Sequence, residues 1–409
     1  MATTVPLNKI KVLLLENIHT EAESYFVEQG FDVTRLSHAL SEDELIEQAS
    51  DVHLIGVRSK TQLTQRYLES ARNLWGIGCF CIGTNQVDLA TASRLGIPVF
   101  NSPFQNTRSV AELVVSETVA LHRNLFTRSA QMHAGQWNKS AAGAHEIRGK
   151  VMGIIGYGRI GSQVSILAEA MGMRVKYYDI VDVLPLGNAT PAESLEDLLK
   201  TSDVVSLHVP ATAETAGMMG EQEIRLMKKG AFLLNNARGN VVDIDALATA
   251  LKEGRVGGAA VDVFPEEPSS NQQPFSSPLQ NLDNVILTPH IGGSTVEAQI
   301  SIAQSTSQRL TKLMNNGTTA TAVNVPEVQL PRLRSAHHRI IHYHRNRPGV
   351  LSKLHRIIGD LEINIAAEYL QSNPEFSYLI LDVDPSAHEG QLKSAILDMD
   401  ETIRVRFLW

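Results

Sequence analysis

The chain has 409 residues, enough for two or three folded domains. Its 43% hydrophobic and 20% charged residues are close to the averages of folded globular proteins, which excludes disordered, collagen-like and coiled-coil chains. The net charge of −8 argues against nucleic acid as a partner, because such binding needs a basic surface. No stretch reaches the ~18 apolar residues of a membrane span and the N-terminus lacks a signal pattern, so we expect a cytoplasmic protein with no membrane partner.

Short apolar runs alternate with helix-like polar stretches at the start of the chain. The predicted strands are 11–15, 31–33, 53–57, 74–82 and 99–100. The predicted helices between them are 20–28, 45–49, 67–71 and 89–94. This spacing is typical of parallel strands with crossover helices. The run from Ser109 to His133 then has apolar residues at helical spacing and few charges, which predicts one long, largely buried helix.

The same alternation restarts after that helix, with predicted strands at 151–155, 175–179, 204–208, 231–235, 258–262 and 285–288. Polar stretches interrupted by proline, at 315–326 and 331–338, indicate a linker. The segment beyond it shows the order βαββαβ, which is the ferredoxin-like arrangement. The predicted fold class is therefore α/β, with two doubly wound, Rossmann-like or flavodoxin-like lobes and a C-terminal ferredoxin-like domain.

No metal site is expected. Cys79 and Cys81 alternate with apolar residues, which favours buried strand positions over metal ligands or disulfide partners and fits a reducing compartment. Four histidines gather near the start of the last domain, but no acidic or thiol partner accompanies them: His337, His338, His342 and His344.

A glycine-rich motif, Gly156-Tyr-Gly-Arg-Ile-Gly161, lies between a predicted strand and a predicted helix. In that context Gly156 permits a tight turn, Gly158 lets the backbone approach a pyrophosphate, and Gly161 lets helix and strand pack closely. The N-terminus of the helix offers its free N–H groups to the phosphates. The motif therefore predicts a dinucleotide site.

Asp179 ends the next predicted strand and indicates which dinucleotide binds. A carboxylate there accepts hydrogen bonds from the ribose hydroxyls and repels a 2′-phosphate, and residues 180–183 supply no Arg to accommodate one. NAD is favoured over NADP. The alternative is that Asp179 is only a turn residue after a strand.

Three later loops, each following a predicted strand, supply Arg238, Glu267 and His290. Oxidation of a 2-hydroxy acid needs a base for the hydroxyl proton, a group that orients the base, and a guanidinium that holds the carboxylate. The pKa of a histidine suits the first task, and a planar guanidinium suits the last. Glu266 is an alternative to Glu267, and Asp262 could accept from the nicotinamide carboxamide or act as a cap.

Taken together, these motifs resemble the D-isomer-specific 2-hydroxyacid dehydrogenase family, in its bacterial form with a C-terminal ACT domain. Besides residues 156–161, the resemblance rests on residues 58–61, 77–88, 106–112, 206–210, 236–239 and 288–293, and for the ACT domain on residues 344–351 and 363–367. It implies Arg238, Glu267 and His290 as the catalytic set. It also implies a substrate domain of residues 1–105 and 297–328, an NAD domain of residues 106–296 and an ACT domain of residues 336–409.

The resemblance extends to the ligand contacts. For NAD it implies Gly156, Gly158, Arg159, Ile160, Gly161, Asp179, Pro210, Ala237, Arg238, Asp262, His290 and Gly293. For the substrate, expected to be 3-phosphoglycerate or 3-phosphohydroxypyruvate, it implies Arg58, Ser59, Lys60, Asn106, Lys139 and Arg238. Where relatives carry a second Arg in the first motif, this chain has Lys60, which keeps the charge but loses the bidentate fork. For serine as an allosteric effector it implies His344, Asn346 and Asn364.

The expected activity is therefore NAD-dependent oxidation of D-3-phosphoglycerate, the first step toward serine, with feedback inhibition by serine and a homotetrameric assembly in which Trp137 contacts another subunit. Two alternatives stay open. One is a reductase of another 2-oxo acid, such as hydroxypyruvate, glyoxylate or 2-oxoglutarate. The other is an NAD-sensing binding protein or corepressor.

Overall fold

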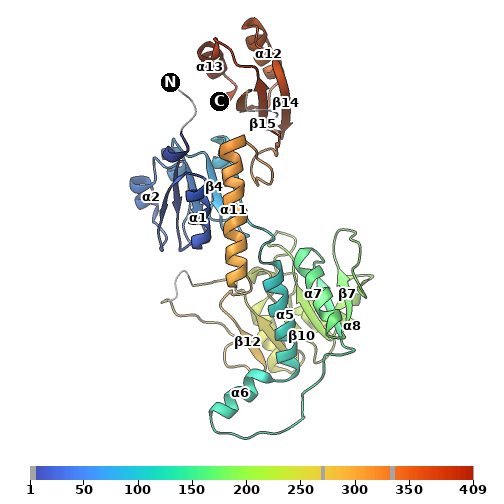
Figure 1. The fold of residues 1–409 in the computed structure, drawn as a ribbon. Helices are drawn as coiled ribbons and strands as arrows, with labels where there is room; N and C mark the ends of the chain where they lie inside the picture. Colours follow the sequence, from blue (N-terminus) through green and yellow to red (C-terminus); the bar gives the residue numbers. More distant parts are fainter. Residues whose placement is uncertain (1–5, 269–271, 332–336, 409) are drawn as a thin grey trace. The chain divides into compact units, whose positions relative to one another are not determined.

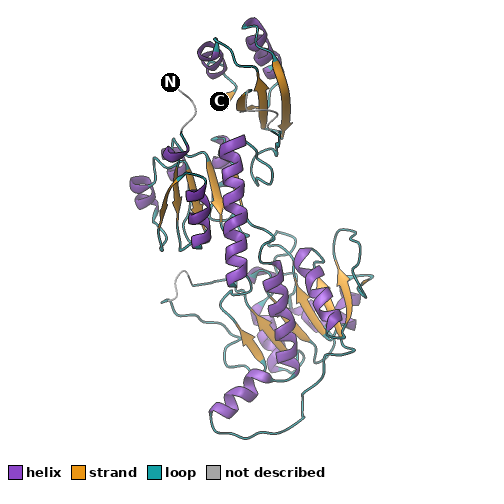
Figure 2. Cartoon of the chain, in the orientation of Figure 1, coloured by secondary structure: helices purple, strands orange, loops and turns teal. Residues whose placement is uncertain are grey.

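The computed structural model describes residues 6–268, 272–331 and 337–408, and the middle of the predicted linker, residues 332–336, lies outside the described residues. The chain forms two compact units, one of residues 1–105 with 299–409 and one of residues 106–298. Each unit contains a parallel sheet with helices packed against it (Figures 1 and 2). This confirms the predicted α/β fold class.

The first unit begins with a five-stranded parallel sheet in the order β2-β1-β3-β4-β5, which is the flavodoxin-like order. Its strands are β1 (Lys11–Leu14), β2 (Asp32–Arg35), β3 (Leu54–Val57), β4 (Gly76–Cys79) and β5 (Val99–Phe100). Its helices are α1 (Thr20–Glu28), α2 (Glu42–Gln48), α3 (Gln65–Ser70), α4 (Leu89–Arg94) and most of α11 (Val296–Asn316). Every residue of β3 and β4 is buried, because helices cover both faces of a parallel sheet.

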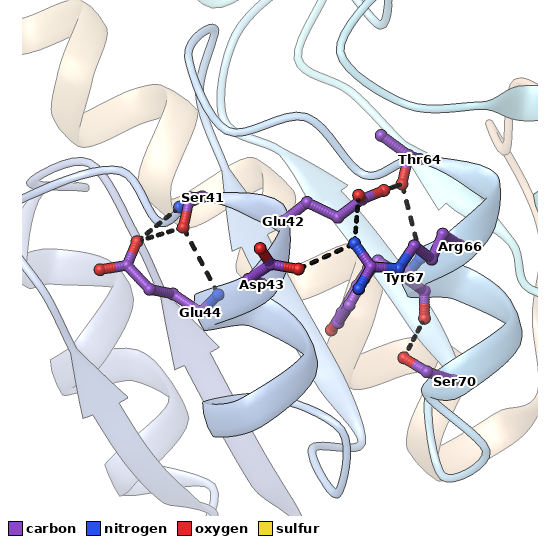
Figure 3. Close-up of polar contacts among 8 residues, drawn as sticks. All are labelled: Ser41, Glu42, Asp43, Glu44, Thr64, Arg66, Tyr67 and Ser70. Carbon is purple, nitrogen blue, oxygen red and sulfur yellow. Dashed lines mark hydrogen bonds and ion pairs between the residues drawn. The ribbon is translucent and has the colours of Figure 1, made fainter.

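Polar side chains fix the start of α2 and join it to α3 (Figure 3). The hydroxyl of Ser41 caps the helix while Glu44 accepts from the backbone N–H of Ser41 at 2.7 Å, a capping box. Arg66 of α3 reaches back to Glu42 and Asp43, with 2.8 Å between the guanidinium and each carboxylate. These contacts join α2 to α3 on the surface of the unit.

The first unit also contains the predicted βαββαβ domain, whose four strands form an antiparallel sheet in the order β14-β15-β13-β16. Its elements are β13 (His338–Arg345), α12 (Val350–Asp360), β14 (Ile365–Ser372), β15 (Phe376–Val383), α13 (Glu389–Leu397) and β16 (Thr402–Leu408). A buried ion pair between Arg339 and Asp382 joins β13 to β15, with nitrogen to oxygen distances of 2.6 and 2.7 Å. Arg339 also donates to the carbonyls of Asn316 and Leu330, which ties the sheet to the segment that precedes it.

The second unit is built on a seven-stranded parallel sheet in the order β12-β11-β10-β9-β6-β7-β8. The strands are β6 (Val151–Ile155), β7 (Arg174–Tyr178), β8 (Thr190–Pro191), β9 (Val204–Leu207), β10 (Phe232–Asn235), β11 (Gly258–Val261) and β12 (Val285–Leu287). The helices are α5 (Thr107–His122), α6 (Leu125–His133), α7 (Arg159–Ala170), α8 (Leu195–Thr201), α9 (Glu221–Leu226) and α10 (Ile244–Lys252). The strand order reverses between β6 and β9, which is where such sheets bind ligands.

The prediction of one helix from Ser109 to His133 is wrong. The helix ends at His122, and α6 begins after Asn124, whose φ of 49° lies in the left-handed region that an α-helix cannot contain. More than half of α5 is buried, whereas α6 has no buried residue. Figure 1 shows α6 and the loop after it extending away from the sheet. The prediction failed because apolar residues keep their helical spacing on both sides of Asn124, where the helix breaks.

Candidate active site

The turn from β6 to α7 fits a dinucleotide phosphate. Gly156 has φ of 90°, and a Cβ there would lie 2.7 Å from the carbonyl oxygen of His208. A Cβ at Gly161 would lie 2.2 Å from the carbonyl oxygen of Gly156, so helix and strand meet too closely for any side chain. A Cβ at Gly158 would meet nothing within 4 Å, so this glycine faces open space at the start of α7, where a pyrophosphate can approach the backbone.

Asp179 lies directly after β7 and holds the glycine turn. One of its carboxylate oxygens accepts from the backbone N–H of Tyr157 at 2.7 Å, and the other accepts from that of Val181 at 3.0 Å. Each oxygen has a second lone pair that ribose hydroxyls can use. The residue is therefore both a turn residue and a candidate ribose ligand, which unites the two interpretations of the sequence.

The other residues expected around NAD lie on the loops of the same unit. Pro210 follows β9, and its carbonyl accepts from the hydroxyl of Thr215 at 2.6 Å. The backbone N–H of Ala237 donates to the side chain of Asn235 at 3.2 Å. Asn106 lies beside Gly293, where a Cβ would be 2.5 Å from its amide nitrogen. Arg159 and Ile160 open α7.

The carboxyl ends of β10, β11 and β12 bring the expected catalytic residues into one region. The Nδ1 atom of His290 donates to the Oε2 atom of Glu267 at 2.8 Å. The hydrogen bond to Glu267 raises the pKa of His290 above its usual value, although burial and the charge of Arg238 oppose the rise. Burial acts to raise the pKa of Glu267, but the bond to His290 and nearby positive charges leave that pKa below its usual value. The pair therefore favours an imidazolium next to a carboxylate.

Arg238 follows β10, and its guanidinium donates to the carbonyl of Ala237 at 2.7 Å. Its charge acts on both members of the His290–Glu267 pair. Beside that pair is a cavity of about 520 Å³, a size suited to a small ligand. It is lined by Phe264, Glu267, Pro268, Gln273, Phe275, Leu287, Thr288, Pro289 and His290.

Asp262 holds the loop on which His290 lies. Its buried carboxylate accepts from the backbone N–H groups of Ile291 and Gly292 at 2.8 Å and from the hydroxyl of Thr288 at 2.6 Å. His290 has φ of 55°, a left-handed conformation that costs energy for a residue with a side chain. Asp262 is thus a positioning residue for His290, a role that neither interpretation of the sequence included.

The other expected substrate residues lie in separate places. Arg58, Ser59 and Lys60 follow β3 in the first unit, and their backbone N–H groups, with that of Thr61, all donate to the buried carboxylate of Glu16 at 2.8–3.2 Å. Lys139 is in the loop after α6 of the second unit. It lines a cavity of about 510 Å³ with Arg123, Arg128 and Trp137, apart from the one that His290 lines.

Sequence reasoning missed Glu16. Its signal is an acidic residue two positions after the end of β1, where a side chain can reach the end of a neighbouring parallel strand. Its φ of 60° shows that the backbone is bent to allow this.

The residues expected to bind serine are in the βαββαβ domain. His344 is buried on β13, with Nδ1 bonded to the carbonyl of Arg345 at 2.9 Å and Nε2 without a partner. Burial lowers the pKa of His344 and keeps it neutral. Asn346 donates to the carbonyl of Asn373 at 2.8 Å, and Asn364 to the carboxylate of Asp384 at 3.2 Å. In the part of the chain that is described, no cluster of histidine, cysteine or acidic residues is arranged to hold a metal ion, and no helix is long and apolar enough to cross a membrane.

A parallel sheet with a glycine-rich turn at its switch point and an imidazole–carboxylate pair beside a small-molecule cavity defines a nicotinamide-dependent dehydrogenase. The family model for the NAD binding domain of D-isomer specific 2-hydroxyacid dehydrogenases matches residues 115–292. The model for an acetohydroxyacid synthase small subunit-like ACT domain matches residues 340–404.

Full-length relatives agree with these matches. The chain is 51% identical to a D-3-phosphoglycerate dehydrogenase of Dictyostelium discoideum, over 100% of this chain and 99% of the relative. It is 52% identical to one of Haemophilus influenzae, over 98% of each chain. The chain belongs to the D-isomer specific 2-hydroxyacid dehydrogenase family, and its second unit binds NAD as predicted.

Solved structures show the same likeness. A D-lactate dehydrogenase from Aquifex aeolicus, complexed with NAD and lactic acid, is 30% identical with a TM-score of 0.64 and matches 74% of this chain and 95% of its own. The TT0316 protein of Thermus thermophilus is also 30% identical, with a TM-score of 0.68 over 74% of this chain and 96% of its own.

We expect the Glu267→Gln substitution to lower the pKa of His290, because the hydrogen bond to that carboxylate is the main cause of the rise and burial opposes it. The pKa is measured by NMR titration of the imidazole, with His290→Ala to assign the signal. Glu266→Gln, one residue away, is the matched control and should leave the pKa of His290 unchanged. An equal shift in both variants would contradict the pairing.

Proposed function

We propose that this enzyme oxidises D-3-phosphoglycerate to 3-phosphohydroxypyruvate with NAD, the first step toward serine. The observation that carries the proposal is the full-length similarity to D-3-phosphoglycerate dehydrogenases at about half identity. The His290–Glu267 pair and the basic loop of Arg58 and Lys60 supply the chemistry that this reaction needs. Both cysteines are free thiols, which supports a site of action in the reducing cytoplasm.

His290 acts as the base in the oxidation. Glu267 engages its Nδ1 atom, which leaves Nε2 to accept the proton of the substrate hydroxyl. The imidazolium that forms is stabilised by the carboxylate of Glu267, and it returns the proton in the reverse reaction. Arg238 holds the substrate carboxylate with its planar fork. Bound NAD supplies the hydride acceptor.

The phosphate of the substrate is assigned to the loop of Arg58, Ser59 and Lys60. Arg58 and Lys60 form no salt bridge with the described residues, so their charges remain available to an anion. Glu16 fixes the backbone from which these side chains extend.

This assignment is tested by kcat/KM for 3-phosphohydroxypyruvate against hydroxypyruvate, glyoxylate and 2-oxoglutarate. We expect the phosphorylated substrate to be preferred. Arg58→Ala and Lys60→Ala should each lower its kcat/KM by roughly 10- to 100-fold, the value of a charge-assisted hydrogen bond. Hydroxypyruvate, which has no phosphate, is the control and should be little affected. A preference for an unphosphorylated 2-oxo acid would identify that acid as the substrate instead. Absence of turnover with all four compounds would favour the NAD-sensing alternative.

Glu16→Gln provides a separate test of the loop. The carboxylate of Glu16 accepts hydrogen bonds from the backbone N–H groups of the loop. In glutamine one of the two oxygens is replaced by an NH₂ group, which cannot accept, so the loop loses part of its anchor. We expect the KM for the phosphorylated substrate to rise about tenfold or more while the KM for NAD stays constant. Glu47→Gln, at an exposed position of the same unit, is the control. An unchanged substrate KM in Glu16→Gln would show that the loop does not bind substrate.

Regulation by serine is proposed for the ACT domain. The neutral, buried His344 offers an unpartnered Nε2 to the hydroxyl or ammonium of an amino acid. Asn346 is two residues further along the chain, whereas Asn364 lies at the other end of the sheet, beside Asp384. The enzyme is further inferred to be a homotetramer. The support is the apolar, exposed surface of the extended α6 region, where Trp137 is 80% exposed and Phe126 is 58% exposed.

Serine is expected to inhibit the wild-type enzyme, and His344→Ala should shift the inhibition curve to about tenfold higher serine or beyond, as expected for a lost buried hydrogen bond. His355→Ala is the matched control, because His355 is an exposed histidine of the same domain. Identical curves for wild type and His344→Ala would remove His344 from the effector site.

A further inference from the structure

Glu117 is a buried carboxyl group outside the active-site loops. It lies on α5, its residue is 3% exposed, and its Oε2 atom accepts from the amide nitrogen of Asn236 at 3.1 Å. Its other oxygen, Oε1, is buried without a partner, and so is the amide oxygen of Asn236. The two groups thus share one hydrogen bond and leave one unpaired oxygen each.

Both unpaired oxygens are satisfied if Glu117 carries a proton. An ionised carboxylate can only accept, so it cannot pair with the amide oxygen of Asn236. A carboxylic acid at Oε1 donates to that oxygen, and the acid and the amide then form two hydrogen bonds side by side. A buried carboxylate with a single neutral donor is also costly.

The electrostatic surroundings agree. Burial raises the pKa of Glu117 to about 8, and the negative charge of Asp262 adds to the rise, although the hydrogen bond from Asn236 opposes it. The strands β10, β11 and β12 next to α5 contain no ionisable side chain. The other charged groups on α5 and on the helices packed against it are Arg108, Glu112, His122, Arg128, His133, Arg159 and Glu169, and none of them has a resolved effect on the pKa of Glu117.

We propose that Glu117 works as a neutral carboxylic acid that pairs with Asn236 through two hydrogen bonds and so positions the loop carrying Arg238. Asn236 follows β10 and precedes Arg238 by two residues. The side chain of Asn235 brackets the same turn, since it accepts from the N–H of Ala237 at 3.2 Å and donates to the carbonyl of Arg238 at 3.0 Å. Loss of the proton removes one of these supports and places a second buried negative charge near Asp262.

The inference rests on the proposed function only for its effect on turnover. When Glu117 ionises, Arg238 loses its fixed place, so the KM for the hydroxy acid should rise about three- to tenfold as the pH passes about 8, the value of a neutral hydrogen bond. The KM for NAD should stay constant. Deprotonation of His290 has the opposite effect on turnover with rising pH. The oxidation becomes faster as the imidazolium loses its proton, because the neutral imidazole is the base.

The decisive variant is Glu117→Gln. Glutamine forms the same two bonds with Asn236 as the protonated acid does, but it cannot ionise. The alkaline rise in KM should therefore be absent from this variant and present in Glu112→Gln, a control on the same helix at an exposed position. An alkaline rise that persists in Glu117→Gln would overturn the proposal.

Two further measurements need no turnover and so separate this inference from the substrate assignment. Infrared difference spectra between neutral and alkaline pH should show the loss of a protonated carboxyl band in the wild type and in Glu112→Gln, but not in Glu117→Gln. The stability that the proton provides is complete below the ordinary pKa of 4.5 and is lost as the pH rises through about 8. The Tm of the wild type should therefore fall relative to that of Glu117→Gln over this range. A Tm difference that does not vary with pH, or a wild type without the band, would show that Glu117 is ionised throughout.

Discussion

Three hydrogen bonds meet at the buried carboxylate of Asp262, and they hold the loop that presents His290 with a left-handed backbone. Without them the loop would relax toward an ordinary conformation and move the imidazole. The bond between His290 and Glu267 depends on this placement, because a hydrogen bond of 2.8 Å tolerates little displacement. The chemistry proposed for the site therefore rests on a residue whose carboxylate holds the backbone of the His290 loop.

Buried acids serve as internal anchors elsewhere in the chain, each with a different partner. Glu16 accepts from four backbone N–H groups, Asp382 forms an ion pair with Arg339, and Glu117 shares a hydrogen bond with an amide. At Glu117 the single amide partner and the nearby negative charge of Asp262 favour the neutral form.

Much of the architecture could be predicted from the sequence, because short apolar runs that alternate with helical stretches are typical of parallel strands joined by crossover helices. The place of the glycine-rich turn between β6 and α7 could also be predicted, because it depends on neighbours along the chain. The break at Asn124 was not, because helical spacing continues on both sides of it. The roles of Glu16, Asp262 and Glu117 were hidden for a different reason. Each acts on a residue that is distant in sequence, and only the packed sheets reveal which backbone groups or amides these carboxyls reach.

The arrangement at Glu16 limits how the neighbouring loop can recognise an anion. Glycine-rich phosphate sites use backbone amides, which are fixed dipoles in the protein. Here the amides of residues 58–61 already donate to an internal carboxylate, so a dianion at this loop is left to the side chains, chiefly the cations of Arg58 and Lys60. Attraction of that kind is screened by dissolved salt. The recognition proposed for this loop would therefore be sensitive to ionic strength, in contrast to binding of a phosphate by backbone amides.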